Sequence, residues 1–194
     1  LLLGRHFVNL AAGGLELVTR RLTGPCERFA LLQGIGLPPQ RATHGVDRSR
    51  RLCRLNEPLL RRLLRELGDE ATAFRFEVAP NPCVGAAILS RGELVAKGFH
   101  RVWGGPHAER DALENAARTD VPRADWDTLV VTLEPCSSTG KTCPCVQAIL
   151  DAGIREVVVG ERDPDPRHRG KGLDELRAAG VNVHLLEGCA PLDV

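Results

Sequence analysis

The sequence has 194 residues, 43% of them hydrophobic, which suffices for one domain with a buried core but would leave two domains cramped. Its formal net charge of +1 argues against a general nucleic-acid binder. It contains no run of about 18 or more apolar residues, and the opening LLLGRHFVNLAAGG is unlike a signal peptide, so we expect a soluble, cytoplasmic protein without a membrane segment.

Basic side chains are concentrated in the N-terminal part of the chain. Residues 1–75 carry 13 Lys or Arg and 7 Asp or Glu, whereas residues 76–194 carry 13 and 18. We therefore predict three segments: a basic, partly helical extension of unclear role (1–75), the functional domain (76–188) and a short tail (189–194).

The segment 50–67, RRLCRLNEPLLRRLLREL, predicts a basic amphipathic helix that is interrupted near Pro58. Packing of its leucines on the domain, with the arginines in water, is the favoured interpretation. Contact with RNA or an acidic partner is the alternative, but no aromatic residues interleave with the basic ones. The leucines predicted to share one side are Leu52, Leu55, Leu59, Leu60, Leu63, Leu64 and Leu67.

From residue 84 onward, apolar periodicity predicts a regular series of strands and helices. Strands that alternate with helices after a hairpin imply parallel pairing with helical crossovers. The predicted fold class is therefore α/β, a three-layer α/β/α sandwich with a mixed sheet of about five strands. In chain order the predicted elements are strands 84–90 and 92–100, helix 107–119, strand 127–133, helix 145–152, strand 155–160, helix 173–180 and strand 181–187.

The cysteines indicate a metal or catalytic role. Their number, seven, is odd, and three of them lie close together in the sequence at Cys136, Cys143 and Cys145. Without a secretory leader, clustered thiols favour metal binding or catalysis over a disulfide framework.

A histidine and two of these thiols form a candidate zinc site. His107 opens a predicted helix, Cys136 follows a predicted strand, and Cys145 opens the next helix. Three protein ligands would leave the fourth position of a tetrahedral zinc ion to water, which is typical of catalytic sites. We therefore expect Zn²⁺ as the cofactor. Cys143 could compete as a ligand, but the spacing favours Cys145, and Cys143 is interpreted as a small buried thiol.

Glu109 lies two residues after His107, where it could move a proton without binding the metal. For this pair alone, an acidic side chain at a helix start is the simpler explanation. Together with Pro135-Cys136 and Cys145, however, the pair forms the His-x-Glu and Pro-Cys signature of zinc deaminases.

Several segments of residues 80–180 resemble the deaminase domain of the bifunctional riboflavin-biosynthesis enzymes, the diaminohydroxyphosphoribosylaminopyrimidine deaminases of the cytidine deaminase-like superfamily. The eight residues between Cys136 and Cys145 are typical of this family, whereas most nucleobase deaminases have PCxxC. The matching segments are PNPCVGAAI, GGPHAERDAL, VTLEPCSSTGKTCPC, AILDAGI, DPDPRHRGKGL and LRAAGV.

By this resemblance, His107, Cys136 and Cys145 would bind zinc and Glu109 would shuttle protons. The resemblance also implies a set of substrate contacts and a possible homo-oligomer. The implied contacts to the pyrimidine and sugar phosphate are Asn81, Ala108, Ser138 and Lys141, with Asp163 and Asp165 near the ribosyl phosphate chain.

Some positions differ from the family pattern. Ser138 replaces a common histidine, Cys143 a usual proline, and Asp165 stands where asparagine is frequent, so that a further carboxylate would repel phosphate. His100 and His168 are interpreted as ordinary polar loop residues.

The resemblance implies hydrolytic deamination of the diaminopyrimidinone ribosyl phosphate intermediate of riboflavin synthesis. One alternative is a deaminase of another nucleobase, nucleotide or related metabolite. Another is a catalytically silent zinc-containing binding module with 50–67 as its contact surface, although a structural zinc would not need Glu109. In the bifunctional enzymes a reductase domain follows the deaminase; the sequence stops at Val194, and no reductase can be claimed from it.

Overall fold

The computed structural model describes residues 56–138 and 143–189. Apart from Cys143, these residues belong to one compact unit. The predicted positions Leu52, Leu55 and Lys141 lie outside the described residues, as does the tail from residue 190 onward.

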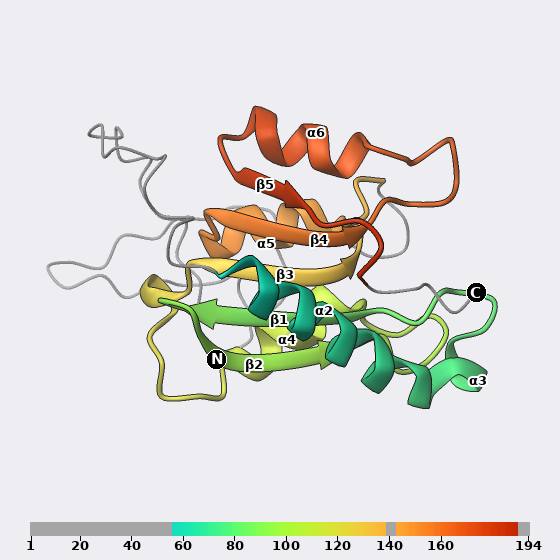
Figure 1. Cartoon of the computed structure of the whole chain (residues 1–194), viewed down its shortest axis with the longest axis horizontal. Helices are drawn as coiled ribbons and strands as arrows, with labels where there is room; N and C mark the ends of the chain where they lie inside the picture. Colours follow the sequence, from blue (N-terminus) through green and yellow to red (C-terminus); the bar gives the residue numbers. More distant parts are fainter. Residues whose placement is uncertain (1–55, 139–142, 190–194) are drawn as a thin grey trace, which may run out of the picture. The chain divides into compact units, whose positions relative to one another are not determined.

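A five-stranded mixed sheet forms the centre of this unit (Figure 1). The strand order is β2-β1-β3-β4-β5; β1 runs antiparallel to β2 and β3, whereas β4 runs parallel to β3 and β5. This topology confirms the predicted hairpin followed by parallel crossovers. The strands are β1 (Gly85–Ser90), β2 (Glu93–Phe99), β3 (Thr128–Leu133), β4 (Glu156–Glu161) and β5 (Asn182–Leu185).

Helices cover both faces of the sheet, as the predicted sandwich requires (Figure 1). On the central strand β3, Leu129 and Val131 pack with α4, α5 and α6, whereas Val130 packs with α2 on the other face. Burial on both faces explains why the central strands are continuous apolar runs. The helices are α2 (Glu57–Ala71), α4 (Ala108–Ala116), α5 (Cys145–Ala152) and α6 (Lys171–Ala178), with the short α3 (Arg75–Val78) and 3₁₀ turns Thr72–Phe74 and Arg123–Asp125.

Helix α2 belongs to the packed unit. Its first turn contains Pro58, which begins the helix instead of interrupting it, because a proline at this position loses no helical hydrogen bond. Leu60, Leu64 and Leu67 are buried against the sheet, which agrees with the interpretation that leucines of this segment pack on the domain. Leu59, predicted on the same side, is 62% exposed. The segment boundary predicted at residue 76 stays a prediction.

A close contact fixes helix α4 on strand β2. A Cβ atom on Gly98 would lie 2.0 Å from the backbone nitrogen of Ala112, so only glycine permits this approach. The Phe99 N–H donates to Asp111 Oδ2 at 2.9 Å, and Asn115 Nδ2 donates to the Lys97 carbonyl at 2.9 Å. These contacts set the position of the α4 N-terminus.

Within residues 56–138 and 143–189, no helix is both long and apolar enough to cross a membrane.

The burial of α2 predicts unequal effects of two leucine truncations in the same helix. Leu64→Ala should lower the free energy of unfolding by about 2–5 kcal/mol, because it leaves a cavity against the sheet. Leu59→Ala should change it by less than about 0.5 kcal/mol, because this side chain is exposed. Urea unfolding of both variants measures the difference; equally small losses would contradict the packing of α2.

Candidate active site

Three elements bring one histidine and two cysteines together. His107 is the N-cap residue of α4, Cys136 follows the end of β3, and Cys145 is the first residue of α5. The Nδ1 atom of His107 lies 3.6 Å from Cys136 Sγ and 3.4 Å from Cys145 Sγ. One ligand atom from each residue lies within 4.8 Å of the others, so the group could hold a metal ion.

The first turn of α5 holds Cys136 in place. The Cys145 N–H donates to Cys136 Sγ at 3.3 Å, and the Val146 N–H donates to the Cys136 carbonyl at 3.2 Å. The N-terminus of a helix carries partial positive charge and favours a thiolate at this point. The helix therefore both orients the sulfur and stabilises its negative charge.

The two thiols have opposite pKa shifts. The hydrogen bond from Cys145 and, less strongly, that from His107 lower the pKa of Cys136 to about 4. The same Cys136–Cys145 hydrogen bond, together with burial, raises the pKa of Cys145 well above its usual value. The hydrogen bond with Cys136 also raises the pKa of His107. The Cys136 thiol is therefore the more readily deprotonated of the two.

The chemistry of these donors fits zinc. Thiolate sulfur and imidazole nitrogen are preferred zinc ligands, and three protein donors are the number found in catalytic zinc sites. Both cysteines carry free thiols, as a metal ligand requires. Cys143 is buried, as expected from the sequence, but it is disulfide-bonded instead of a thiol, and it is not part of the clustered group.

Glu109 is a buried carboxyl group in the first turn of α4, with only 3% of its surface exposed. Burial raises its pKa, and the negative charge of Cys136 adds to the rise. It is not a member of the potential ligand group. A carboxyl next to a metal site but outside the ligand set is suited to proton transfer.

His100 is not the ordinary loop residue expected from the sequence. It is 4% exposed, and its ring contacts that of His107 edge to face at 5.5 Å. Nδ1 lies 2.9 Å from the Pro106 carbonyl, which can only accept, so Nδ1 carries the hydrogen and Nε2 accepts from Asn81 Nδ2 at 3.2 Å. The Asn81 amide is thereby oriented with its NH₂ group toward His100 and its oxygen turned away from that ring.

The loop between β4 and α6 contains the two predicted aspartates. Asp163 Oδ1 accepts the Asp165 N–H at 2.8 Å. Asp165 pairs with Arg167, whose Nε and Nη2 atoms lie 3.0 and 2.6 Å from its oxygens, and this hydrogen bonding lowers the pKa of Asp165 well below its usual range. The guanidinium offsets the carboxylate charge that the sequence suggested would repel phosphate.

The structure gives little information on the other predicted substrate contacts, Ala108, Ser138 and Lys141. Ala108 is buried next to His107, and Ser138 is exposed two residues after Cys136. Lys141 lies outside the described residues. Sequence reasoning gave no role to His100 or to the buried Glu134 of LEPC; a charged residue directly after an apolar strand was the only signal for the latter.

Residues 60–161 match the family model for the cytidine and deoxycytidylate deaminase zinc-binding region. This range contains all three clustered side chains and Glu109.

Individual relatives carry related names. The riboflavin biosynthesis protein RibD of Synechocystis is 49% identical over 107 residues, which are 55% of this chain and 28% of that protein. A diaminohydroxyphosphoribosylamino-pyrimidine deaminase of Buchnera aphidicola is 40% identical over 57% of this chain and 72% of its own length. The solved structure of Acinetobacter baumannii RibD has a TM-score of 0.62 and 34% identity, over 68% of this chain and 36% of that one. This chain thus spans less than a third of the Synechocystis protein.

The set of donor atoms predicts that zinc binding depends on Cys136. Cys136→Ala should weaken zinc binding by more than about 100-fold, since even the loss of groups that surround a ligand costs about 10–100-fold. Cys189→Ala is a matched control, because Cys189 is also a free thiol but is buried with α2 on the opposite face of the sheet. Elemental analysis after dialysis against a weak chelator measures bound zinc. Full zinc content in Cys136→Ala would contradict the assignment.

Proposed function

Because this chain belongs to the cytidine and deoxycytidylate deaminase family, we propose that it is a zinc-dependent deaminase acting on the diaminopyrimidinone ribosyl phosphate of riboflavin synthesis. The observation that carries this proposal is the cluster of His107, Cys136 and Cys145 with the buried Glu109 close by. The names of the RibD and Buchnera relatives support the choice of substrate.

In this proposal His107, Cys136 and Cys145 hold the zinc ion. When bound, zinc acts as a Lewis acid that lowers the pKa of a coordinated water to roughly 7. The helix N-termini at His107 and Cys145 orient two of the ligands, and the Cys145 N–H orients the third.

Glu109 acts as the proton shuttle. Water adds to the amine-bearing ring carbon, and the Glu109 carboxylate takes the proton that the water loses. The carboxyl group then returns this proton to the leaving amine, so that ammonia departs. The second proton of the water moves to the neighbouring ring nitrogen, and a ring carbonyl remains. The burial of Glu109 keeps bulk water away from this transfer.

Asn81 and the Ala108 carbonyl are proposed to bind the pyrimidine. The hydrogen bond to His100 leaves the Asn81 oxygen as an acceptor for a ring N–H, and the Ala108 carbonyl can accept from the exocyclic amine. Ser138, Lys141, Asp163 and Asp165 are proposed to contact the sugar phosphate. The Asp165–Arg167 pair supports this role, because it brings a guanidinium to the same loop.

The cytoplasmic location, the homo-oligomer and the absence of nucleic-acid binding stay predictions. Light scattering of the purified chain would measure its oligomeric state.

Glu109→Gln tests the proposed chemistry. The variant should lose about 10²- to 10⁴-fold in kcat, because an amide cannot relay the proton, while zinc content stays at the wild-type level. Glu114→Gln, on the same helix, should keep wild-type activity. The measurement is ammonia release from the riboflavin intermediate and from a panel of other pyrimidines and nucleotides.

The outcome of this assay distinguishes between the candidate functions. Faster release from another pyrimidine would replace the proposed substrate. Failure of the wild-type chain to release ammonia from any compound would favour a silent zinc-containing module, and wild-type activity in Glu109→Gln would overturn the shuttle.

The orientation of Asn81 predicts a defect in substrate binding. Asn81→Ala should lower kcat/KM by about tenfold or more, because the substrate loses a half-buried hydrogen-bond acceptor. Asn182→Ala, at the start of β5, should not change it. Steady-state kinetics measure the effect; equal kcat/KM in Asn81→Ala and wild type would exclude this contact.

A further inference from the structure

Glu134 is a buried carboxylate directly after β3, two residues before Cys136, and only 6% of its surface is exposed. It accepts three backbone N–H groups from distant parts of the sequence. Oε2 accepts from Asp163 at 3.2 Å and from Gly170 at 2.9 Å, and Oε1 accepts from Gly172 at 3.0 Å. All three donors belong to residues 162–170, here called the β4–α6 loop, or to the first turn of α6.

A second contact joins the same two segments. A Cβ atom on Gly172 would lie 2.0 Å from the Pro135 carbonyl oxygen, so the start of α6 lies directly on the backbone that precedes Cys136. The Glu134 N–H also donates to the Glu161 carbonyl at 2.8 Å, at the end of β4. The ends of β3 and β4 and the start of α6 are therefore closely packed around Glu134.

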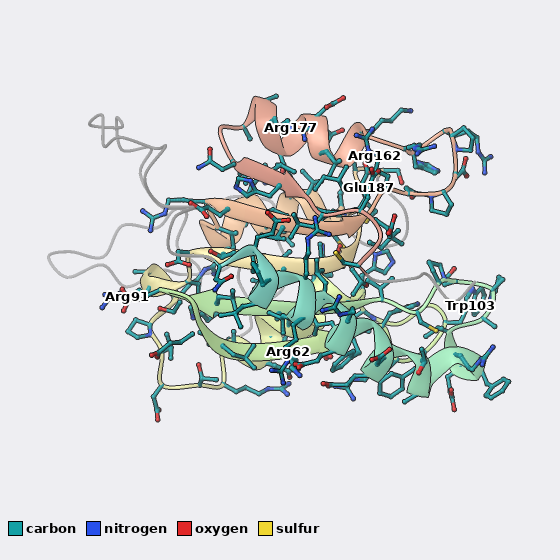
Figure 2. All side chains as sticks on the ribbon, in the orientation of Figure 1. Arg62, Arg91, Trp103, Arg162, Arg177 and Glu187 are labelled. Atoms are coloured by element: carbon teal, nitrogen blue, oxygen red, sulfur yellow. The ribbon has the colours of Figure 1, made fainter. Side chains whose placement is uncertain are left out.

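This carboxylate is suited to hold a loop. A buried charge is costly unless hydrogen bonds satisfy it, and bonds from N–H groups to an ionised carboxylate are stronger than neutral ones. The N-terminus of α6 adds favourable electrostatics. An exposed ion pair between Arg162 and Glu187, 3.3 Å apart, provides only a weak additional restraint on the start of the loop (Figure 2).

The loop lies where a substrate would bind. Figure 1 shows that the β4–α6 connection starts at the end of the sheet where β3 also ends. The chain that follows β3 leads to Cys136. In sheets of this kind ligands bind outside the carboxyl ends of the parallel strands. The loop places Asp163 and the Asp165–Arg167 pair at this end of the sheet.

We propose that Glu134 is a positioning residue that holds the β4–α6 loop beside Cys136 as one wall of the substrate site, and thereby sets the affinity for the phosphorylated substrate. The inference rests on the proposed function for the identity of the substrate. The role of Glu134 itself rests on its three hydrogen bonds and on the contact between Gly172 and Pro135.

Glu134→Gln tests this role, with Glu156→Gln as the matched control. An amide has one acceptor oxygen, so it cannot satisfy all three N–H groups, and its NH₂ group faces at least one of them. Glu156 is also a glutamate with 6% exposure on the same sheet, but it lies at the opposite end of β4. Both substitutions alter a buried carboxylate, but only one alters the loop.

In ammonia-release kinetics, Glu134→Gln should raise KM for the ribosyl phosphate substrate about tenfold, with kcat within about threefold of wild type. The loop must then be ordered when the substrate binds, which weakens binding without changing the chemical step. Zinc content should not change. Glu156→Gln should keep the wild-type KM, whatever its loss of stability. Wild-type KM in Glu134→Gln, or the same KM change in both variants, would overturn the proposal.

Hydrogen exchange of the substrate-free, zinc-loaded chain gives a result that does not depend on the proposed function. The amides of Asp163, Gly170 and Gly172 should exchange at least about tenfold faster in Glu134→Gln than in Glu156→Gln. Unchanged exchange at these amides would overturn the role of Glu134. If the wild-type chain is inactive while exchange changes as expected, the proposed substrate is wrong and the role of Glu134 in holding the loop is supported.

Discussion

The position of the Cys136 sulfur is the constraint on which the candidate site depends, because this atom joins three elements. It follows β3, accepts an N–H from the first residue of α5, and lies 3.6 Å from His107 at the N-terminus of α4. Each element is held by packing some distance away: β3 lies between β1 and β4, and α4 rests on β2 where Gly98 leaves no room for a side chain. The site is therefore only as rigid as the sheet and the helices around it.

Two buried glutamates near this sulfur have different surroundings. Glu134 accepts three backbone N–H groups, which satisfy its charge and tie two loops together. Burial instead raises the pKa of Glu109, which makes the protonated form more accessible. Because their environments differ, one glutamate can stabilise the structure while the other transfers protons. This contrast supports the separate roles that we propose for the two side chains.

Much of the fold could be predicted from the sequence, because its elements have local signals. Apolar runs with turn residues between them placed all five strands of the sheet, and helix α5 ends at Gly153, a glycine in the left-handed conformation that commonly stops a helix. The hydrogen bonds of His100 with Asn81 and of Glu134 with Gly170 could not be predicted. They join residues 19 and 36 positions apart in the sequence, which only the folded chain brings together. The burial of Leu60 but not Leu59 likewise depends on which side of α2 faces the sheet.

The packing of α2 also limits where this polypeptide can be divided or fused. Its leucines cover the sheet face formed by Leu89, Val130 and Val158. A junction placed inside this helix would expose a contiguous apolar surface to solvent, and such surfaces promote self-association. Division of the chain within α2 is therefore incompatible with the fold, and the helix must be inherited together with the sheet that it shields.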